Sequence, residues 1–356
     1  MQTMARRSTG TRGYSGYRGR RRGRGVLAVV LVLILIAACG FLFAQRYMVY
    51  DADGSVRFEF PWTKKTPQED APDDSTGGGT EKDELEITVE KPVIQDTRAA
   101  ELSDDALSGG WEDELAALDG SVNAVAVRLK DDSGRLLYDS SVRGAIDCGA
   151  VEGGSAARSA IEGLAASKYY TIGRISTLHD SVYAYAHMTD AAVCQQSGLV
   201  WYDTNSTHWL APEKQAAREY VTEIVTECAQ MGFDELLLED FHYPRDGRMS
   251  RIKTDERTMT QQEALSLLSG ELRTILKAAN YEGKLSVRVD ADIVLAGSEE
   301  RSGIVMSEYV RDFDRVYVPV TADQLEAVTE AMKDYDVEFV PILTDAAESG
   351  SYLIEK

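Results

Sequence analysis

Beyond about residue 92, short apolar runs rich in β-branched and aromatic residues alternate with stretches of helical periodicity. The expected strands are Thr97–Leu102, Val122–Leu129, Tyr170–Thr177, Leu199–Tyr202, Glu235–Glu239, Leu285–Asp290, Arg315–Val320 and Val337–Leu343. The clearest expected helices are Glu213–Met231, Thr260–Asn280 and Ala322–Tyr335. Such alternation is typical of a parallel α/β sheet. Eight strands in about 250 residues is the size of a (β/α)8 TIM barrel, so we predict one over residues 92–356.

A doubly wound open sheet is the alternative architecture. In its nucleotide-binding form it needs a glycine-rich phosphate loop after a strand, and no G-x-G-x-x-G or G-x-x-x-x-G-K-[ST] motif occurs here. We therefore expect no cofactor. The body cysteines Cys148, Cys194 and Cys228 match no zinc spacing, and the four histidines are scattered, so we expect no metal. One disulfide is compatible with three cysteines, with buried free thiols as the default.

Residues 26–44 form a run of 19 residues without a charge. As a helix this run is about 28 Å long, close to the hydrocarbon thickness of a bilayer. Arginines crowd its N-terminal side, so the positive-inside rule predicts a single-pass signal anchor with residues 1–25 as a basic cytoplasmic tail. The body is then extracytoplasmic. A rival interpretation is a bacterial lipoprotein lipidated at Cys39, which places the body on the same side of the membrane.

Two further segments precede the predicted barrel. Residues 45–61 alternate apolar and polar side chains around Asp51–Gly54, which favours a short juxtamembrane hairpin. Residues 62–91 are rich in Pro, Gly, Ser, Thr and acidic residues, the composition of a flexible acidic linker. The chain is thus expected to consist of tail, anchor, hairpin, linker and barrel.

The charge distribution limits the partners of the body. Eight arginines lie in the first 25 residues, which leaves 30 basic against 59 acidic side chains, or a net charge of −29, in the remainder. Binding to nucleic-acid phosphates needs clustered Lys and Arg, so we exclude nucleic acid as a partner of the body. The arginine-rich tail suits anionic lipid headgroups beside a membrane helix.

Active sites of TIM barrels lie at the C-terminal ends of the strands, so polar residues that end apolar runs are the candidates. The segment GFDELLLEDFHYP ends a leucine run at Glu239 and Asp240. Successive strand residues point to opposite faces, so only one of these two can face the barrel axis. Two carboxylates flanking one sugar ring are what glycosidic cleavage requires. A helix cap or a solvated loop residue is the competing interpretation for each carboxylate.

On this basis the candidate catalytic residues are Glu239 as general acid/base, with Asp290 or Asp180 as the second carboxylate. The candidate substrate-binding residues are Lys130, Asp131, His179, Trp201, Asp203, Asp240 and His242. The aromatic rings in the loop WYDTNSTHWLAP could stack on sugars or pack in the core.

Four blocks carry a resemblance to a known family: VNAVAVRLKDDSGRLLYDS, YYTIGRISTLHD, the segment from Val200 to Pro244, and LSVRVDAD. In order and spacing, they resemble the glycoside hydrolase-like TIM-barrel family of bacterial membrane-anchored or secreted proteins, which looks related to the alpha-amylase superfamily. The resemblance covers roughly residues 97–345. It implies a barrel, an extracytoplasmic location and a polysaccharide substrate.

The departures from the family pattern fall on its polar positions. Glu239 stands where the pattern has Asp, Asp240 where it has Tyr, and His242 where it has Arg. Arg128, His179 and Arg288 replace an Asp, a Lys and an Asp, whereas Lys130, Asp131 and Asp180 match. Such exchanges alter charge and reach where catalysis needs defined geometry.

The resemblance and these departures lead to two expectations about function. The first is a membrane-anchored glycoside hydrolase-like protein that acts on or binds a cell-envelope or extracellular polysaccharide. The alternative is a catalytically degenerate barrel that serves as a glycan- or protein-binding envelope module. The sequence leaves open whether the protein is an enzyme.

Overall fold

The computed structural model describes residues 48–50, 56–58, 94–255 and 257–355. The chain divides into two units, residues 1–83 and 84–356. In the first unit, β1 (Met48–Tyr50) pairs antiparallel with β2 (Val56–Phe58), within the segment predicted to form a hairpin. The predicted anchor, residues 26–44, lies outside the described residues. None of the helices within the described ranges has the length and apolarity needed to cross a bilayer.

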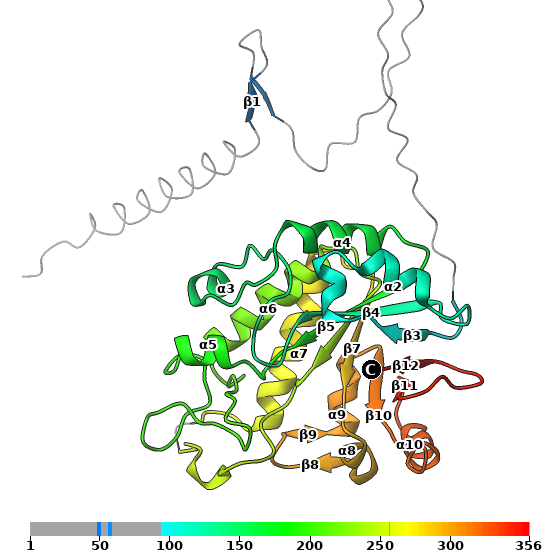
Figure 1. The fold of residues 1–356 in the computed structure, drawn as a ribbon. Coiled ribbons are helices and arrows are strands. Elements are labelled where there is room, and N and C mark those ends of the chain that lie inside the picture. Colours follow the sequence, from blue (N-terminus) through cyan, green and yellow to red (C-terminus); the bar gives the residue numbers. More distant parts are fainter. Residues whose placement is uncertain (1–47, 51–55, 59–93, 256, 356) are drawn as a thin grey trace, which may run out of the picture. The chain divides into compact units, whose positions relative to one another are not determined.

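In the described part of the second unit, eight parallel strands close into a barrel (Figure 1). They are β3 (Arg98–Glu101), β4 (Ala124–Lys130), β5 (Tyr170–Ser176), β6 (Glu235–Glu239), β7 (Lys284–Arg288), β10 (Arg315–Pro319), β11 (Glu338–Leu343) and β12 (Tyr352–Ile354). Each strand pairs with the next in chain order, and β12 returns to β3. The predicted TIM barrel is therefore confirmed.

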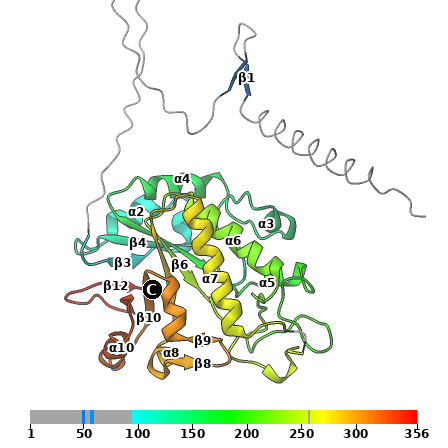
Figure 2. The ribbon, with the colours of Figure 1, turned by 180° about the vertical axis from the view of Figure 1, so that it is seen from behind.

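Helices cover the outside of the strands. They are α2 (Trp111–Ala117), α3 (Arg143–Cys148), α4 (Ser155–Ala165), α5 (Ser181–Ala186), α6 (Gln215–Ala229), α7 (Gln261–Ala278), α8 (Ala291–Ala296), α9 (Met306–Tyr309) and α10 (Leu325–Met332). Short 3-10 turns are η1 (Asp104–Ser108), η2 (Met249–Arg251) and η3 (Val310–Asp312), and β8 (Ser298–Glu299) and β9 (Ile304–Val305) form a small hairpin. Figure 2 shows α6 and α7 side by side across the barrel, where their apolar stripes join the main core.

One expected strand is wrong and one observed strand was missed. Leu199–Tyr202 is not a strand of the barrel; Val200 makes only an isolated bridge to Cys194 in the long loop before α6. The eighth strand is β12 instead. It follows β11 through residues 344–351, which contain no helix. A three-residue strand has too short a pattern to be recognised from sequence, and its pairing on both sides stabilises it.

Side chains inside the barrel form layers because alternate strand residues point inward. On β6, Leu237 belongs to the inner apolar cluster, together with Ile172 and Tyr317 from other strands. Glu235, two residues earlier, forms an ion pair with Arg315 at the N-terminal end of the barrel. Glu239, two residues later, lies at the C-terminal end. An apolar layer thus separates two charged layers.

Candidate functional site

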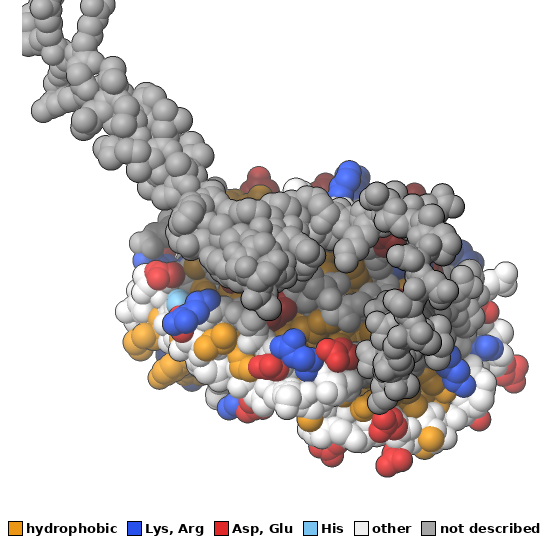
Figure 3. All heavy atoms as spheres, turned by 90° about the horizontal axis from the view of Figure 1, so that it is seen from above, with side chains coloured by type: hydrophobic (Ala, Val, Ile, Leu, Met, Phe, Trp, Pro, Cys, Tyr) orange, Lys and Arg blue, Asp and Glu red, His pale blue; other side chains and the backbone are white. Residues whose placement is uncertain are grey.

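A cavity of about 750 Å³ lies at the C-terminal ends of the strands. Of the ten candidate residues from the sequence, eight line it: Lys130, Asp131, His179, Asp203, Glu239, Asp240, His242 and Asp290. Asp180 and Trp201 do not line it. On the face of the molecule visible in Figure 3, acidic and basic side chains are interspersed. The cavity has the same mixed character, with arginines and carboxylates together on its walls.

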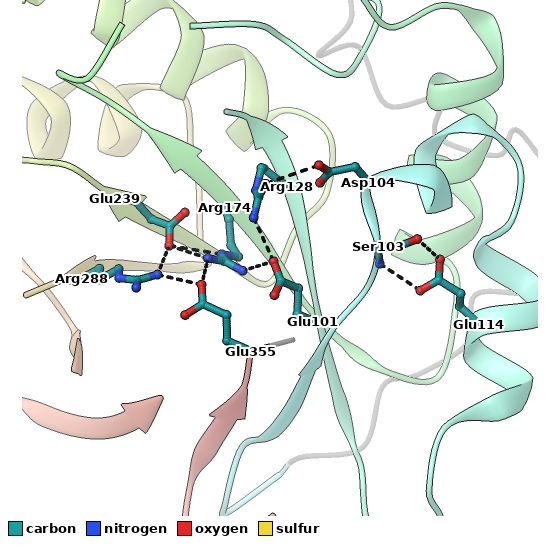
Figure 4. Close-up of polar contacts among 9 residues, drawn as sticks. All are labelled: Glu101, Ser103, Asp104, Glu114, Arg128, Arg174, Glu239, Arg288 and Glu355. Carbon is teal, nitrogen blue, oxygen red and sulfur yellow. Dashed lines mark hydrogen bonds and ion pairs between the residues drawn. The ribbon is translucent and has the colours of Figure 1, made fainter. Parts of the chain in front are cut away.

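The floor of the cavity is a network of arginines and glutamates, which is the upper charged layer of the barrel (Figure 4). Arg174 on β5 is 2% exposed at its side chain and forms ion pairs with Glu101, Glu239 and Glu355. Burial by itself would lower the pKa of Arg174, but the carboxylates of Glu239, Glu101 and Glu355 outweigh it and raise the pKa above the usual arginine value. The buried guanidinium therefore stays charged.

Two more arginines complete this network. Arg288 on β7 forms ion pairs with Glu239 at 3.1 Å and with Glu355 at 2.8 Å. Arg128 on β4 forms ion pairs with Glu101 at 3.2 Å and with Asp104 at 3.3 Å. We call Glu101, Arg128, Arg174, Glu239, Arg288 and Glu355 the floor network. Its members come from β3, β4, β5, β6, β7 and the residue that follows β12.

Glu239 uses its two carboxylate oxygens differently. Oε1 accepts hydrogen bonds from Arg174 Nε at 3.2 Å, Arg174 Nη2 at 2.8 Å and Arg288 Nη1 at 3.1 Å. No described residue donates a hydrogen bond to Oε2, and Figure 4 shows this oxygen directed away from the floor network. The side chain is 10% exposed. Guanidinium groups only donate hydrogen bonds, so Oε1 acts as a carboxylate acceptor.

Asp240 follows Glu239 in a left-handed backbone conformation, with φ of 51°. Its Oδ2 accepts a hydrogen bond from Ser176 Oγ at 2.6 Å. Positive φ is uncommon for a residue other than glycine, although Asp tolerates it better than most. This backbone turn brings both Glu239 and Asp240 to the cavity, although strand alternation alone would direct only one of them there.

Asp180 is fully buried behind the cavity wall. Its Oδ1 caps α5 by accepting from the Tyr183 backbone N–H, and its Oδ2 lies 2.9 Å from Lys130 Nζ. Burial raises the pKa of Asp180, while the Lys130 ammonium opposes that shift. Gly134, with φ of 100°, packs directly on this carboxylate, since a Cβ there would lie 2.0 Å from Asp180 Oδ1. Asp180 therefore organises the loop after β4 and the start of α5, and does not face the cavity.

An aromatic wall borders the cavity on one side. The rings of His179 and Trp209 stack at a centroid distance of 4.3 Å, and Trp209 contacts His242 at 5.3 Å. An antiparallel bridge between His179 and Trp209 aligns the two rings. Trp201, the ring selected from the sequence, is 1% exposed and donates its indole N–H to the Arg248 carbonyl. Trp209 is also largely buried, at 6% exposed, but unlike Trp201 it lines the cavity.

Asp203 supports this wall from below. Its Oδ2 accepts from the Thr207 hydroxyl at 2.6 Å and from Trp209 Nε1 at 3.0 Å, while Oδ1 accepts from the backbone N–H groups of Asn205 and Thr207. Partial burial would raise the pKa of Asp203, but these hydrogen bonds outweigh burial and lower it. His179 Nε2 lies 2.6 Å from the same Thr207 hydroxyl.

Asp290 also lines the cavity, two residues after the end of β7. Its Oδ2 accepts from Arg245 Nη1 at 2.6 Å, and its side chain is 48% exposed. Arg245 also forms ion pairs with Asp292 and Glu299. Asp290 and Glu239 therefore both line the cavity, and each is paired with arginine.

Sequence reasoning missed Glu101, Arg174, Arg245 and Glu355, and it considered Trp209 as a sugar-stacking ring but selected Trp201. Strand alternation was a signal that could have found two of them. It places Arg174 on the same inward face as Ile172, and Glu101 on the same inward face as Ala99. Glu355 could not be found in this way, because β12 has no recognisable pattern.

Possible metal ligands and thiols are the other reactive groups in the described part of the chain. No group of three or more His, Cys, Asp or Glu side chains there is arranged to hold a metal ion. Cys148, Cys194 and Cys228 are free thiols. Burial raises the pKa of the Cys228 thiol to about 12, so it is an inert core residue.

A comparison with protein families finds one match. The family described as "Putative glycosyl hydrolase domain" matches residues 114–308, which is more than half of the chain. The matched region runs from α2 to α9 and contains every candidate residue selected from the sequence. No curated protein sequence matches the chain.

Solved structures similar to this chain include three with low sequence identity. A hypothetical protein from Ruminiclostridium thermocellum is 22% identical, with 53% of this chain and 96% of that chain covered and a TM-score of 0.44. The glycoside hydrolase domain of PelA from Pseudomonas aeruginosa is 13% identical, with coverages of 70% and 83% and a TM-score of 0.39. A chitobiase from Flavobacterium johnsoniae is 13% identical, with coverages of 68% and 37% and a TM-score of 0.43.

Proposed function

The chain belongs to the glycosyl hydrolase-like family whose sequence model it matches, and from this premise we propose that it cleaves a polysaccharide in the barrel cavity. The substrate is a cell-envelope or extracellular polysaccharide, and the protein is held at the membrane by residues 26–44 with its barrel outside the cell. The position of the cavity supports this proposal, because TIM-barrel enzymes carry their chemistry at the C-terminal ends of the strands.

The observation that carries the proposal is the environment of Glu239. Two arginines bind Oε1, and Oε2 has no hydrogen-bond donor among the described residues. This arrangement presents a carboxylate oxygen to a ligand in the cavity. Cleavage of a glycosidic bond passes through an oxocarbenium-like transition state, which such a carboxylate stabilises or attacks. The geometry thus favours Glu239 as a nucleophile or charge-stabilising group over the proton-donating role expected from the sequence.

Asp290 is the proposed second carboxylate, because it lines the cavity from the neighbouring strand end whereas Asp180 is buried behind the wall. The rings of His179, Trp209 and His242 together form an aromatic wall of the cavity, against which a sugar ring can pack. Asp131 and Asp240 also line the cavity, and each has one carboxylate oxygen that accepts no hydrogen bond from the described residues, so both can accept from sugar hydroxyls. A cavity with an aromatic surface and a few polar groups that fix orientation is typical of a ligand site.

A second candidate function is glycan binding without cleavage. One observation favours it: Glu239 and Asp290 both accept hydrogen bonds from arginines, so neither is placed as the proton donor that cleavage needs.

The proposed membrane location has its own support. Residues 26–44 form an uncharged run long enough to span a bilayer, and arginines precede it.

The decisive experiment compares the full chain, in detergent micelles, with its Glu239→Gln and Trp209→Ala variants on a panel of bacterial envelope polysaccharides. New reducing ends and retained polysaccharide are both measured. We expect Glu239→Gln to lower cleavage by about 10²–10³-fold, the effect of losing one charge-stabilising group, while retention persists. We expect Trp209→Ala to weaken retention by roughly tenfold, the effect of losing about 1.4 kcal/mol.

Glu338→Gln is the matched control, since Glu338 pairs with Lys284 and Arg315 at the far end of the barrel. It should cleave and bind like the parent. Retention without new reducing ends in the parent would establish the binding-only function. If the parent shows neither new reducing ends nor retention with any polysaccharide of the panel, both proposed functions are contradicted.

A further inference from the structure

Four atoms in the floor network form a closed ring (Figure 4). Arg174 Nη2 donates to Glu239 Oε1 at 2.8 Å and also to Glu355 Oε1. Arg288 Nη1 donates to the same two oxygens, at 3.1 Å and 2.8 Å. Each Nη nitrogen of a guanidinium carries two hydrogens, so each of these two nitrogens can donate one hydrogen to Glu239 and one to Glu355. Glu355 therefore occupies the second hydrogen of both nitrogens that hold Glu239.

The two arginines in this ring differ in how firmly they are held. Arg174 is 2% exposed and has a third ion pair, with Glu101. Arg288 is 28% exposed, and its ion pairs in the described part of the chain are those with Glu239 and Glu355. Arg174 and Arg288 bind the same two oxygens, so their like charges repel each other. Without the charge of Glu355, Arg288 is the side chain free to move away.

Glu355 is itself fixed in place. It follows β12, and its backbone N–H donates to the Leu343 carbonyl at 3.1 Å. Partial burial would raise the pKa of Glu355, but Arg288 and Arg174 outweigh burial and lower it, so the carboxylate stays ionised. Its side chain is 27% exposed and lines the cavity.

From this ring we propose that Glu355 is a positioning residue for Glu239, an inference that rests on the role proposed above for Glu239. Glu355 holds Arg288 so that its Nη1 binds Glu239 through Oε1 only. The carboxylate of Glu239 is thereby turned so that Oε2 faces the cavity. Glu355 acts through Arg288 and makes no contact with the reacting atoms.

The test uses the full chain in detergent micelles with the variants Glu355→Gln and Glu355→Asp, and Glu338→Gln as control. The first readout is kcat and KM with the polysaccharide that the parent cleaves. Glu355→Gln should lower kcat by about 10–100-fold with little change in KM, because Glu239 is misplaced for the transition state. Glu355→Asp keeps the negative charge on a shorter side chain, so its decrease in kcat should be smaller than that of Glu355→Gln.

The second readout needs no turnover. Phenylglyoxal modifies guanidinium groups, and peptide mass mapping measures the rate at Arg288. Glu355→Gln should raise this rate several-fold, whereas Glu338→Gln should leave it at the parent value. The proposal is overturned if Glu355→Gln keeps the parent reactivity at Arg288, or if reactivity rises while kcat is unchanged.

The two readouts separate this inference from the proposed function. A parent chain that cleaves nothing would refute the hydrolase, and Arg288 reactivity would still decide whether Glu355 holds the arginine. Circular dichroism identifies a variant that does not fold. If Glu355→Gln does not fold, Glu355→Asp is used for the test. The positioning role is rejected if Glu355→Asp and the parent have the same phenylglyoxal reactivity at Arg288 and the same kcat.

Discussion

At the residue scale, the floor network explains how this barrel tolerates charge in its interior. Burying an ion costs several kcal/mol unless it is paired and hydrogen-bonded. Each of the three arginines contacts at least two carboxylates, and Glu101 and Glu239 each contact two arginines. Complete pairing offsets the desolvation of the layer. Removal of one partner leaves an uncompensated charge, which is why single substitutions here should have large effects.

Asp203 yields a pH-dependent prediction at the same scale. Asn in its place can accept through only one oxygen, so part of its set of hydrogen bonds is lost. We expect Asp203→Asn to lower the free energy of unfolding by about 1–3 kcal/mol at pH 7. The folded-state pKa of Asp203 lies below the unfolded value of about 3.9, so its stabilisation is full above that value and is lost as pH falls through the folded pKa.

Urea unfolding at pH 7, 5 and 3.5 checks this prediction. The difference in the free energy of unfolding between the parent and Asp203→Asn should be equal at pH 7 and 5 and smaller at pH 3.5. Asp119→Asn is the control, because Asp119 also has a lowered pKa, through hydrogen bonds from Ser121, but is fully exposed. If this difference in the free energy of unfolding does not change with pH, the charge of Asp203 does not contribute to stability.

At the element scale, the strands that the sequence predicted correctly are those with long apolar runs. β6 is the clearest, since its five residues are all buried between neighbours on both sides. Leu199–Tyr202 has a similar local composition but lies in a loop, where Trp201 is buried and Leu199 is 63% exposed. Local pattern does not distinguish these cases, because burial of an aromatic residue needs no strand.

Two helical glycines provide a matched pair of stability predictions. Gly270 lies in α7 with no atom within 4 Å of the position that a Cβ would take. Gly270→Ala should therefore raise the free energy of unfolding by about 0.5–1 kcal/mol, since alanine restricts the unfolded chain. In α4, a Cβ on Gly163 would lie 2.4 Å from Trp111 Cζ2. Gly163→Ala should instead destabilise the protein by about 1–3 kcal/mol through overpacking.

Urea denaturation followed by tryptophan fluorescence measures both glycine variants. We expect the free energy of unfolding to increase in Gly270→Ala and to decrease in Gly163→Ala. A stabilising effect of Gly163→Ala would mean that the Trp111 ring moves aside without cost.

At the scale of the whole molecule, barrel closure joins segments that are far apart in sequence. β12 pairs with β11 and with β3, and Glu355 just beyond it reaches Arg174, 181 positions earlier. The floor network therefore exists only in the closed barrel. This dependence links the stability of the C-terminal segment to the geometry of the candidate site.

The proposed anchor makes a prediction for the whole chain. The full chain should sediment with membranes and be released only by detergent, whereas a chain that begins at residue 45 should stay in the supernatant. Immunoblotting of the two fractions measures this. Cys39→Ser distinguishes the lipoprotein alternative: we expect it to remain in the membrane fraction, and its release would establish lipidation as the anchor.

The sequence by itself determined the fold class and the end of the barrel where function is to be sought. Strand periodicity and the order of elements are local properties, so seven of the eight barrel strands and the three named helices could be read from the pattern. The lining positions of residues such as Glu239 and Asp131 followed from the same rule, because strand ends in a barrel share one face.

Only the tertiary structure decided which of these charges meet. The ring of Arg174, Arg288, Glu239 and Glu355 depends on three strands, and on the residue after a fourth, approaching one axis. The choice of Trp209 over Trp201 depends on how one loop folds against His179. Contacts of this kind are set by packing between distant segments, and no local periodicity encodes them.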